Sequence, residues 1–407
     1  MATPTALPAL PTAAPAHGDR PLRVAIVTES FLPQVNGVTN SVCRILDHLA
    51  DNGHQAIVLA PGQGQDVYRG FPVLRLPGLP LPLYRSFQLG LPSRRLIATA
   101  LRSFAPDVVH LASPVVFGHA AVAVARRLAL PTVAVFQTDL VGFSRRYGLP
   151  YADRVLWPHL RQLHAAVDRT LVPSVATLRQ LADQRVPRLS LWQRGVDTER
   201  FHPRERSEEL RRRLAPDGRA LVGYVGRLAR DKRVDLLAHV AKLRGLRLVI
   251  TGDGPDRRRL RALLPDAVFL GQRTGRELAR VYASLDVFVH TGADETFCQA
   301  VQEALASGVP VVAPAAGGPL DLVDPERTGL LYEPDSVTQL RCAVGRLVHS
   351  PQLRARLAAA TRDSVEHRTW HRVNAELVEH YRQVAGLGAP LGVTPPVVMP
   401  SRGPGAR

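Results

Sequence analysis

Lysine is almost absent from this chain of 407 residues. It occurs only at positions 232 and 242, so arginine supplies nearly all of the positive charge. This scarcity weighs against a phosphorylase that uses pyridoxal phosphate, because that cofactor needs a lysine for its Schiff base. Lys232 is better placed to bind a diphosphate than to form that Schiff base. The absorbance of the purified protein near the Schiff-base band would distinguish the two roles.

Cysteines and long apolar runs are also scarce. Cys43, Cys298 and Cys342 are odd in number and lack the spacing of a metal site, so we expect free thiols in a reducing cytosol. No apolar run is long enough to cross a bilayer. The N-terminal segment has no basic region before an apolar one, so we expect no secretory signal. The composition therefore favours a globular protein of the cytoplasm.

Aromatic residues make up only 5% of the chain, although the formal net charge is +17. The charge favours contact with something anionic, such as a nucleotide, a phospholipid headgroup or a nucleic acid. Single-stranded nucleic acids need aromatic platforms, and the arginines are scattered through both halves, so we expect no nucleic acid partner. Salt-dependent binding to arbitrary DNA would contradict this expectation.

Short apolar runs alternate with helical stretches along most of the chain. Residues 22–28 (LRVAIVT) and 54–60 (HQAIVLA) are typical of buried parallel strands. Similar runs follow at residues 107–112, 132–136, 170–172, 189–193, 221–225, 246–251, 267–270, 286–290 and 309–313. This alternation predicts an α/β protein with two doubly wound, Rossmann-like parallel sheets that face each other across a cleft.

The predicted boundaries follow from these runs. We expect a disordered tail at residues 1–19, an N-terminal domain at 20–195, and a C-terminal domain at 196–367. A helix at 368–386 would cross back to the N-terminal domain, and residues 387–407 would form a flexible tail. Ligands of doubly wound sheets bind at the carboxyl ends of strands.

Residues 291–310 (TGADETFCQAVQEALASGVP) carry the densest chemistry. Glu295 and Glu303 stand eight positions apart. Thr296 with Gln299 predicts a capping box, so a helix should start near Phe297 and stop at Gly308. The amides at its N-terminus would favour an anion between the two carboxylates. A capped helix with a surface glutamate is also common, and this segment alone does not decide.

A second group of charges follows the first strand of the C-terminal half. Arg227 comes directly after Gly226, and Lys232 stands five residues later. A guanidinium fork and an ammonium at one strand end suit a diphosphate. A solvated basic loop is the alternative.

These segments together resemble glycosyltransferase family 4, which has the GT-B fold. The resemblance covers residues 22–381 and rests on ETFCQAVQE, GRLARDK, SFLPQVNGVTNSV and RGVDTERFHP. It is strongest to the members that transfer mannose from GDP-mannose to membrane glycolipids, such as phosphatidylinositol mannosides or glucuronosyl diacylglycerol. A family 4 enzyme with a UDP-sugar donor is the alternative, and an epimerase of similar fold would turn over without an acceptor.

The resemblance implies a role for each matching position. Arg227 and Lys232 would hold the donor diphosphate, Glu295 the transferred sugar, and Glu303 the ribose. The other implied donor contacts are Gly37, Arg273 and the amides of Phe297, Cys298 and Gln299.

The implied reaction retains configuration and requires neither metal nor cofactor, in agreement with the lack of an Asp-x-Asp pair. Relatives often carry histidine where this chain reads FQTD, so Asp139 is a catalytic candidate whose target is open.

One stretch of the N-terminal half predicts contact with a membrane surface. Residues 85–104 (RSFQLGLPSRRLIATALRSF) follow an apolar loop at 76–84. Arg94, Arg95 and Arg102 could meet anionic headgroups, while the apolar side chains pack on the sheet or insert. We therefore expect a peripheral enzyme at the inner face of the plasma membrane.

Overall fold

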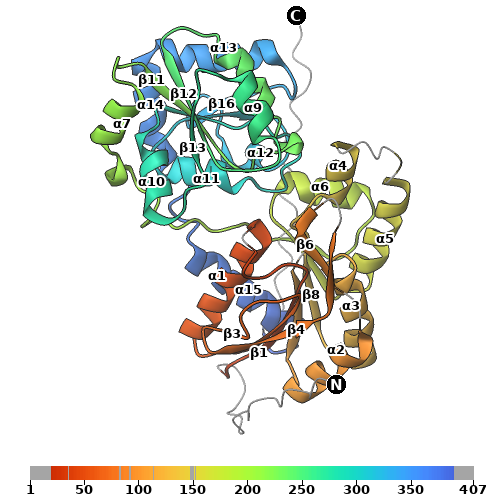
Figure 1. The fold of residues 1–407 in the computed structure, drawn as a ribbon. Helices are drawn as coiled ribbons and strands as arrows, with labels where there is room; N and C mark the ends of the chain where they lie inside the picture. Colours follow the sequence, from red (N-terminus) through yellow and green to blue (C-terminus); the bar gives the residue numbers. More distant parts are fainter. Residues whose placement is uncertain are drawn as a thin grey trace, which may run out of the picture.

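The computed structural model describes residues 20–34, 36–81, 84–90, 93–112, 114–146, 151 and 153–388. Figure 1 shows two α/β halves, with the N-terminal half drawn in red to yellow and the C-terminal half in green to blue. The predicted tail at 1–19 and most of that at 387–407 lie outside the described residues. None of the helices in the described ranges has the length and apolar character that a membrane span requires.

The N-terminal half is built on an eight-stranded sheet in the order β10-β9-β8-β7-β1-β2-β4-β3. Its pairings are parallel except for the short β3, which runs antiparallel to β4. The strands are β1 (Arg23–Thr28), β2 (Gln55–Pro61), β3 (Val67–Tyr68), β4 (Phe71–Leu76), β7 (Val108–Ala112), β8 (Thr132–Val135), β9 (Arg169–Val172) and β10 (Leu189–Leu191). A separate hairpin pairs β5 (Gly78–Leu81) with β6 (Tyr84–Gly90).

Helices cover both faces of this sheet, so its strands are apolar on both sides. In β1, Val24 and Ile26 enter one core while Ala25 and Val27 enter the other. This double burial explains why the strands appear as continuous apolar runs in the sequence. The helices are α1 (Gly37–Asp51), α2 (Arg94–Phe104), α3 (Phe117–Arg127), α4 (Leu140–Arg146), α5 (Asp153–Ala165) and α6 (Val175–Asp183).

The C-terminal half has a six-stranded sheet in the order β13-β12-β11-β14-β15-β16. All of these pairings are parallel. The strands are β11 (Ala220–Val225), β12 (Leu246–Thr251), β13 (Val268–Gly271), β14 (Val287–Val289), β15 (Val311–Pro314) and β16 (Gly329–Tyr332). Numbered along this half, the order is 3-2-1-4-5-6, in which the chain reverses direction across the sheet between β11 and β14.

Its helices pack on both faces of the sheet in the same manner. They are α7 (Glu208–Leu214), α8 (Leu237–Val240), α9 (Arg257–Leu263), α10 (Gly275–Ser284), α11 (Gln299–Ala306), α12 (Pro319–Leu322), α13 (Val337–His349) and α14 (Pro351–Thr361). Both halves are therefore doubly wound, as the alternation of strands and helices predicts.

The last helix, α15 (Trp370–Val384), returns to the N-terminal half and lies beside α1 (Figure 1). The Trp192 indole donates to the Val373 carbonyl at 2.8 Å. The Tyr381 hydroxyl lies 2.8 Å from His110 Nδ1 inside the core. The C-terminal segment thus ties the two halves together at a second place besides the linker near residue 196.

Hydrogen bonds also join the facing edges of the halves. The Thr296 hydroxyl donates to the Gln137 carbonyl at 2.9 Å, and the Thr177 hydroxyl donates to the Thr296 carbonyl at 3.2 Å. The Val175 amide donates to the Asp321 carboxylate at 2.5 Å. The segment that precedes α11 is therefore held by contacts from the N-terminal half.

Candidate active site

The site is built where the strand order of the C-terminal sheet reverses. β11 leads into Gly226 and Arg227, and the neighbouring β14 leads into His290. Connections from these two strands leave in opposite directions, which opens a crevice at their carboxyl ends. Gly252 follows β12 on the other side of β11, and a Cβ there would lie 1.9 Å from the Gly226 carbonyl oxygen, so glycine allows the β11 and β12 loops to approach closely.

Lys232 and Glu295 meet in this crevice. The Lys232 Nζ lies 2.7 Å from Glu295 Oε1 and 3.5 Å from Asp231 Oδ2. Burial disfavours both charges, but each partner stabilises the other. Their attraction raises the pKa of Lys232 above its ordinary value and holds the pKa of Glu295 below its ordinary value. Both groups are therefore ionised at neutral pH.

Arg227 and Arg273, two further predicted donor contacts, differ in position. Arg227 follows β11 after one intervening residue, Gly226, and burial lowers the pKa of its guanidinium while Asp231 and Asp256 oppose that shift. Arg273 follows the edge strand β13, where it is exposed and lies 3.8 Å from Glu277 in a surface pair. Arg227 thus shares a strand-end region with Lys232, whereas Arg273 stands at the rim of the sheet.

The predicted capping box at Thr296 and Gln299 is wrong. α11 begins two residues later than expected, at Gln299, and its N-cap is Cys298 with no side-chain capping bond. The Thr296 hydroxyl donates to the Gln137 backbone carbonyl instead, and the side-chain amide of Gln299 donates to the Gly195 carbonyl at 3.0 Å. Bonds to distant parts of the chain replace the local cap.

The predicted stop at Gly308 is confirmed: α11 ends at Ala306, and Gly308 follows it with a φ of 79°. Val301, Ala304 and Leu305 are fully buried on the inner face of the helix, and Ala300 is partly buried. The residues Phe297 and Cys298 precede the helix, so their amides lie at the positive end of its dipole. A Cβ on Gly318 would lie 1.8 Å from the Phe297 carbonyl oxygen, so the Gly317–Gly318 backbone packs directly on this turn.

Glu303 lies further along α11 and is only partly exposed. Burial raises the pKa of its carboxyl from 4.5 to about 7, although the nearby Tyr282 hydroxyl and Arg200 favour the charged form. Glu303 therefore changes charge near neutral pH, in contrast to Glu295.

The N-terminal half contributes Gly37 through the first turn of α1. Asn36 caps that helix by accepting a bond from the Thr39 amide at 2.9 Å. The Gly37 carbonyl accepts a bond from Arg194 Nη2 at 2.7 Å, and the same guanidinium also donates to the Gln137 side chain. A Cβ on Gly37 would lie 3.2 Å from Arg194 Nη1, so a larger residue would crowd this contact.

Arg194 is a residue that the sequence prediction missed. Burial lowers the pKa of its guanidinium to about 10, and Glu295 opposes that shift. Nothing in the sequence around Arg194 indicates that its side chain turns toward Gly37 and Gln137. It adds a partly buried cation between the halves.

Asp139 lies at the start of α4. Its Oδ1 accepts bonds from the Val141 amide at 3.1 Å and the Gly142 amide at 2.9 Å, so the carboxylate caps that helix. A Cβ on Gly142 would lie 3.4 Å from the Asp294 Cβ. The turn that holds Asp139 therefore faces the loop that precedes Glu295.

Of the predicted membrane-docking stretch, the described part is α2. Arg94, Arg95 and Arg102 are exposed. The apolar side chains of its inner face, Ile97, Leu101 and Phe104, are at most 3% exposed and pack on the sheet, so they cannot insert into a membrane. Leu96 is 48% exposed. The side chains of residues 79–92, which precede α2, lie outside the description.

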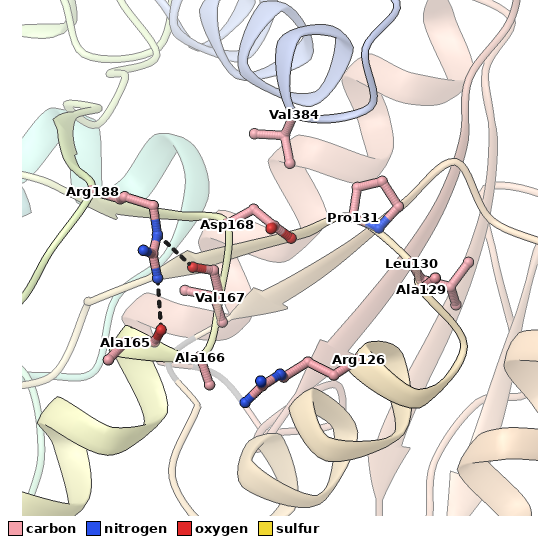
Figure 2. Close-up of a pocket in the computed structure, with 10 residues that line it drawn as sticks. All are labelled: Arg126, Ala129, Leu130, Pro131, Ala165, Ala166, Val167, Asp168, Arg188 and Val384. Carbon is pink, nitrogen blue, oxygen red and sulfur yellow. Dashed lines mark hydrogen bonds between the residues drawn. The ribbon is translucent and has the colours of Figure 1, made fainter.

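A cavity of about 500 Å³ lies in the N-terminal half, beside the amino-terminal ends of β8 and β9 (Figure 2). Its wall includes Arg188, which donates to the Val167 carbonyl at 2.9 Å and the Ala165 carbonyl at 2.6 Å. Asp168 accepts bonds from the Thr132 amide and hydroxyl. These polar groups hold the loops before β8 and β9 together. The segment around Glu295 meets the carboxyl-terminal ends of these strands, so the cavity lies away from it.

Family models match both halves of the chain. The Glycosyltransferase Family 4 model matches residues 35–200, and the Glycosyl transferases group 1 model matches residues 205–364. The GDP-mannose-dependent alpha-mannosyltransferase of Mycobacterium tuberculosis is 53% identical, over 90% of this chain and 97% of its own. The sulfoquinovosyl transferase SQD2 of Arabidopsis thaliana is 34% identical, over 88% of this chain and 73% of its own.

Among solved structures, that of Anabaena Alr3699/HepE in complex with UDP superposes with a TM-score of 0.73 at 18% identity, over 89% of this chain and 100% of that one. This likeness concerns the fold. Two facing doubly wound halves with a site between them define the GT-B class of glycosyltransferases. The identity to curated relatives over nearly their whole length then places the chain: it belongs to glycosyltransferase family 4.

Proposed function

We propose that this protein transfers mannose from GDP-mannose to a membrane glycolipid and retains the α configuration. The observation that carries the proposal is the Lys232–Glu295 pair at the strand-order reversal, in a chain 53% identical to a GDP-mannose-dependent alpha-mannosyltransferase. The pair offers a cation for a diphosphate and a carboxylate for sugar hydroxyls at one point. A glycolipid acceptor is supported by the similarity to a sulfoquinovosyl transferase and an alpha-monoglucosyldiacylglycerol synthase.

The donor would bind as follows. Arg227 and Lys232 would contact the diphosphate, and Glu295 would accept bonds from the hydroxyls of the mannose. Glu303 would accept the ribose hydroxyls. The amides before α11, at Phe297, Cys298 and Gln299, would lie beside the sugar and the phosphate. Gly37 would let the first-domain loop approach the diphosphate, with Arg194 behind it, and Arg273 is the candidate that would contact the base.

The reaction follows from charge. Breaking the sugar–phosphate bond leaves negative charge on GDP and positive charge on the anomeric carbon. Fixed cations and amides stabilise the leaving group without reorganising, and one such donor is typically worth about 10²–10³ in rate. The acceptor hydroxyl would attack from the face that the phosphate leaves, and the departing phosphate would take its proton. Asp139 would contribute a polar contact on the acceptor side.

No metal or cofactor takes part in this scheme, because Arg227 and Lys232 supply the positive charge that an ion would otherwise supply. Excess chelator should therefore leave the activity of the metal-free protein unchanged. An activity that disappears with chelator and returns with Mg²⁺ would contradict the scheme.

The acceptor would be reached at a membrane surface. Arg94, Arg95 and Arg102 lie exposed on α2, where each could contribute about 1 kcal/mol beside an anionic leaflet. With Ile97, Leu101 and Phe104 buried, the attraction would be electrostatic. The enzyme would then be peripheral at the inner face of the plasma membrane, and phosphatidylinositol mannosides or glucuronosyl diacylglycerol would present their headgroups to the cleft.

A donor screen tests the proposal. Purified protein is incubated with membrane lipid extract and either GDP-mannose, GDP-glucose or UDP-glucose, and the lipids are analysed by mass spectrometry. The expected result is a hexose added to a glycolipid with GDP-mannose alone. Transfer from UDP-glucose instead would replace the donor, and turnover without any acceptor would indicate an epimerase.

A further inference from the structure

Three side chains of different chemistry converge beside Lys232. His290, Glu295 and Cys298 each offer one nitrogen, oxygen or sulfur atom, and these three atoms all lie within 4.8 Å of one another. His290 is 3% exposed and Cys298 is 5% exposed. Neither His290 nor the Cys298 thiol has a task in the transfer scheme above.

The environment of His290 points to a missing ligand. Its Nε2 lies 3.4 Å from Glu295 Oε1, close enough for an ion pair when the imidazole is protonated, but neither ring nitrogen makes a hydrogen bond of ordinary geometry within the described part of the chain. Buried polar atoms nearly always make such bonds. A buried imidazole placed between a carboxylate and a thiol without such a bond has the surroundings of a metal ligand.

The backbone at Cys298 fixes where its thiol lies. Its φ of 79° and ψ of 71° place the residue in the left-handed region. This conformation sets the thiol at the start of α11, beside His290.

We propose that His290, Glu295 and Cys298 form a site for a thiophilic divalent cation, with Zn²⁺ as the ion of choice. A nitrogen, an oxygen and a sulfur ligand suit Zn²⁺ and exclude Mg²⁺, which prefers oxygen ligands alone. Zinc bonds of about 2.0–2.3 Å require the ligand atoms to lie about 3.5 Å apart, so a small inward movement suffices. Cys298 binds as the thiolate and His290 as the neutral imidazole, and the protons that both give up go to solvent. Water fills the fourth position.

The ion would compete with Lys232 for Glu295. Because the Lys232 Nζ lies 2.7 Å from Glu295 Oε1, a cation on that carboxylate would separate the pair. The site would thus be inhibitory: Zn²⁺ would withdraw Glu295 from the donor sugar. This consequence rests on the proposed function, whereas metal binding itself does not.

Cobalt provides the test, because Co²⁺ bound to a thiolate gives a near-ultraviolet charge-transfer band. The full chain is titrated with Co²⁺, which is then displaced with Zn²⁺. Cys298→Gly removes the thiol and fits the left-handed backbone, and the Cys43→Ala/Cys342→Ala double variant is the matched control. The expected result is a thiolate band in the wild type and the control that is lost in Cys298→Gly, where Zn²⁺ affinity falls at least about 10–100-fold. A wild type without the band, or an unchanged band in Cys298→Gly, would overturn the site.

A second variant and a donor arm complete the experiment. His290→Gln should weaken Zn²⁺ binding to a similar degree while the thiol stays in place, and wild-type affinity in this variant would overturn the ligand set. Saturating GDP-mannose should prevent Co²⁺ binding. Equal Co²⁺ binding with and without the donor would overturn the inhibitory consequence and the role of Glu295 in sugar binding, and would leave the metal site intact.

Discussion

Lys232 Nζ and Glu295 Oε1 form an ion pair at 2.7 Å. The resemblance to family 4 assigns the lysine to the donor diphosphate and the glutamate to the transferred sugar. An ammonium paired in this way is preorganised for a diphosphate, because the carboxylate already fixes its position. The donor would then approach a charged, partly buried pair and extend it into a network with the phosphate on one side and the sugar on the other. Each residue of the pair can be tested separately.

Glu295→Gln should reduce turnover by about 10²–10³, because the variant loses a charged contact that strengthens as the sugar becomes cationic. GDP affinity should change far less, since GDP carries no mannose. Steady-state rates and calorimetric GDP titration measure the two effects. The matched control, Glu209→Gln, alters an exposed carboxylate on α7 and should leave both unchanged. Near-normal turnover in Glu295→Gln would remove the central assignment.

Arg227→Ala and Lys232→Ala should each cost about 1.5–3 kcal/mol in GDP binding, the range for hydrogen bonds to charged groups. Guanosine, which lacks the diphosphate, should bind both variants nearly as well as it binds the wild type. Lys242→Ala changes the other lysine of the chain and provides the control. Equal losses for GDP and guanosine would mean that the two cations only support the fold.

The raised pKa of the Glu303 carboxyl predicts that donor binding depends on pH. Because burial raises the pKa of its carboxyl to about 7, the group is mostly protonated at pH 6 and mostly ionised at pH 8. Only the carboxylate accepts bonds from both ribose hydroxyls, so GDP-mannose affinity should rise by up to about tenfold over this interval. GDP-mannose suits the titration because its diphosphate does not ionise there. Glu303→Gln should bind more weakly at pH 8 and show no such rise.

The stability of the free protein should change in the opposite direction. Folding raises this pKa from 4.5 to about 7, so the folded state binds more protons than the unfolded state between those values. The free energy of unfolding should therefore fall as the pH rises through this window. Denaturant unfolding at pH 5 and pH 7.5 should show a smaller fall in Glu303→Gln than in the wild type. Loss of both pH effects in Glu303→Gln would assign them to the same carboxyl.

Asp139→Asn should slow transfer while GDP affinity stays nearly intact, because the residue belongs to the acceptor side of the cleft. The asparagine side-chain oxygen can still accept the bonds from Val141 and Gly142, so α4 keeps its cap. Asp139→Ala should in addition lose about 0.5–2 kcal/mol of stability through the missing cap. Full activity in Asp139→Asn would reduce Asp139 to a capping residue.

The fold could be predicted because its strands are buried on both faces. Such strands are continuous apolar runs, and the runs expected from the sequence lie within two residues of eleven strands; residues 246–251, for example, match β12. The strands β3 to β6 and β16 are not among them. Prolines interrupt the sequence from residue 72 onward, and the loop expected at 76–84 is instead part of the β5–β6 hairpin. The start of α11 is displaced because the bonds of Thr296 and Gln299 go to the other half of the molecule.

The site could be predicted only where residues follow strands in sequence. Arg227, Lys232 and Glu295 lie at strand ends, and parallel sheets bring such ends to one edge. Arg194 could not be placed this way, since its guanidinium reaches Gly37 and Gln137 from the linker. The left-handed backbone at Cys298 is equally invisible in the sequence, because φ at a residue other than glycine depends on the tertiary contacts around it.

Binding to membranes supplies the last prediction. Arg94 and Arg95 lie side by side, exposed, in the first turn of α2, while the inner face of that helix is buried. Wild-type protein should cosediment with liposomes in proportion to their anionic lipid content, and added salt should weaken the binding, since exposed charges are screened over about 10 Å at 0.1 M salt.

Arg94→Glu/Arg95→Glu should lose this binding and keep its GDP affinity, because α2 belongs to the opposite half from Lys232. Arg212→Glu/Arg213→Glu is the matched control: it makes the same change in net charge with an adjacent, exposed arginine pair, on α7 of the C-terminal half. If net charge alone drives binding, both double variants will lose it equally. If α2 is the docking surface, only the first will. Binding that ignores lipid charge would place the docking surface elsewhere on the molecule.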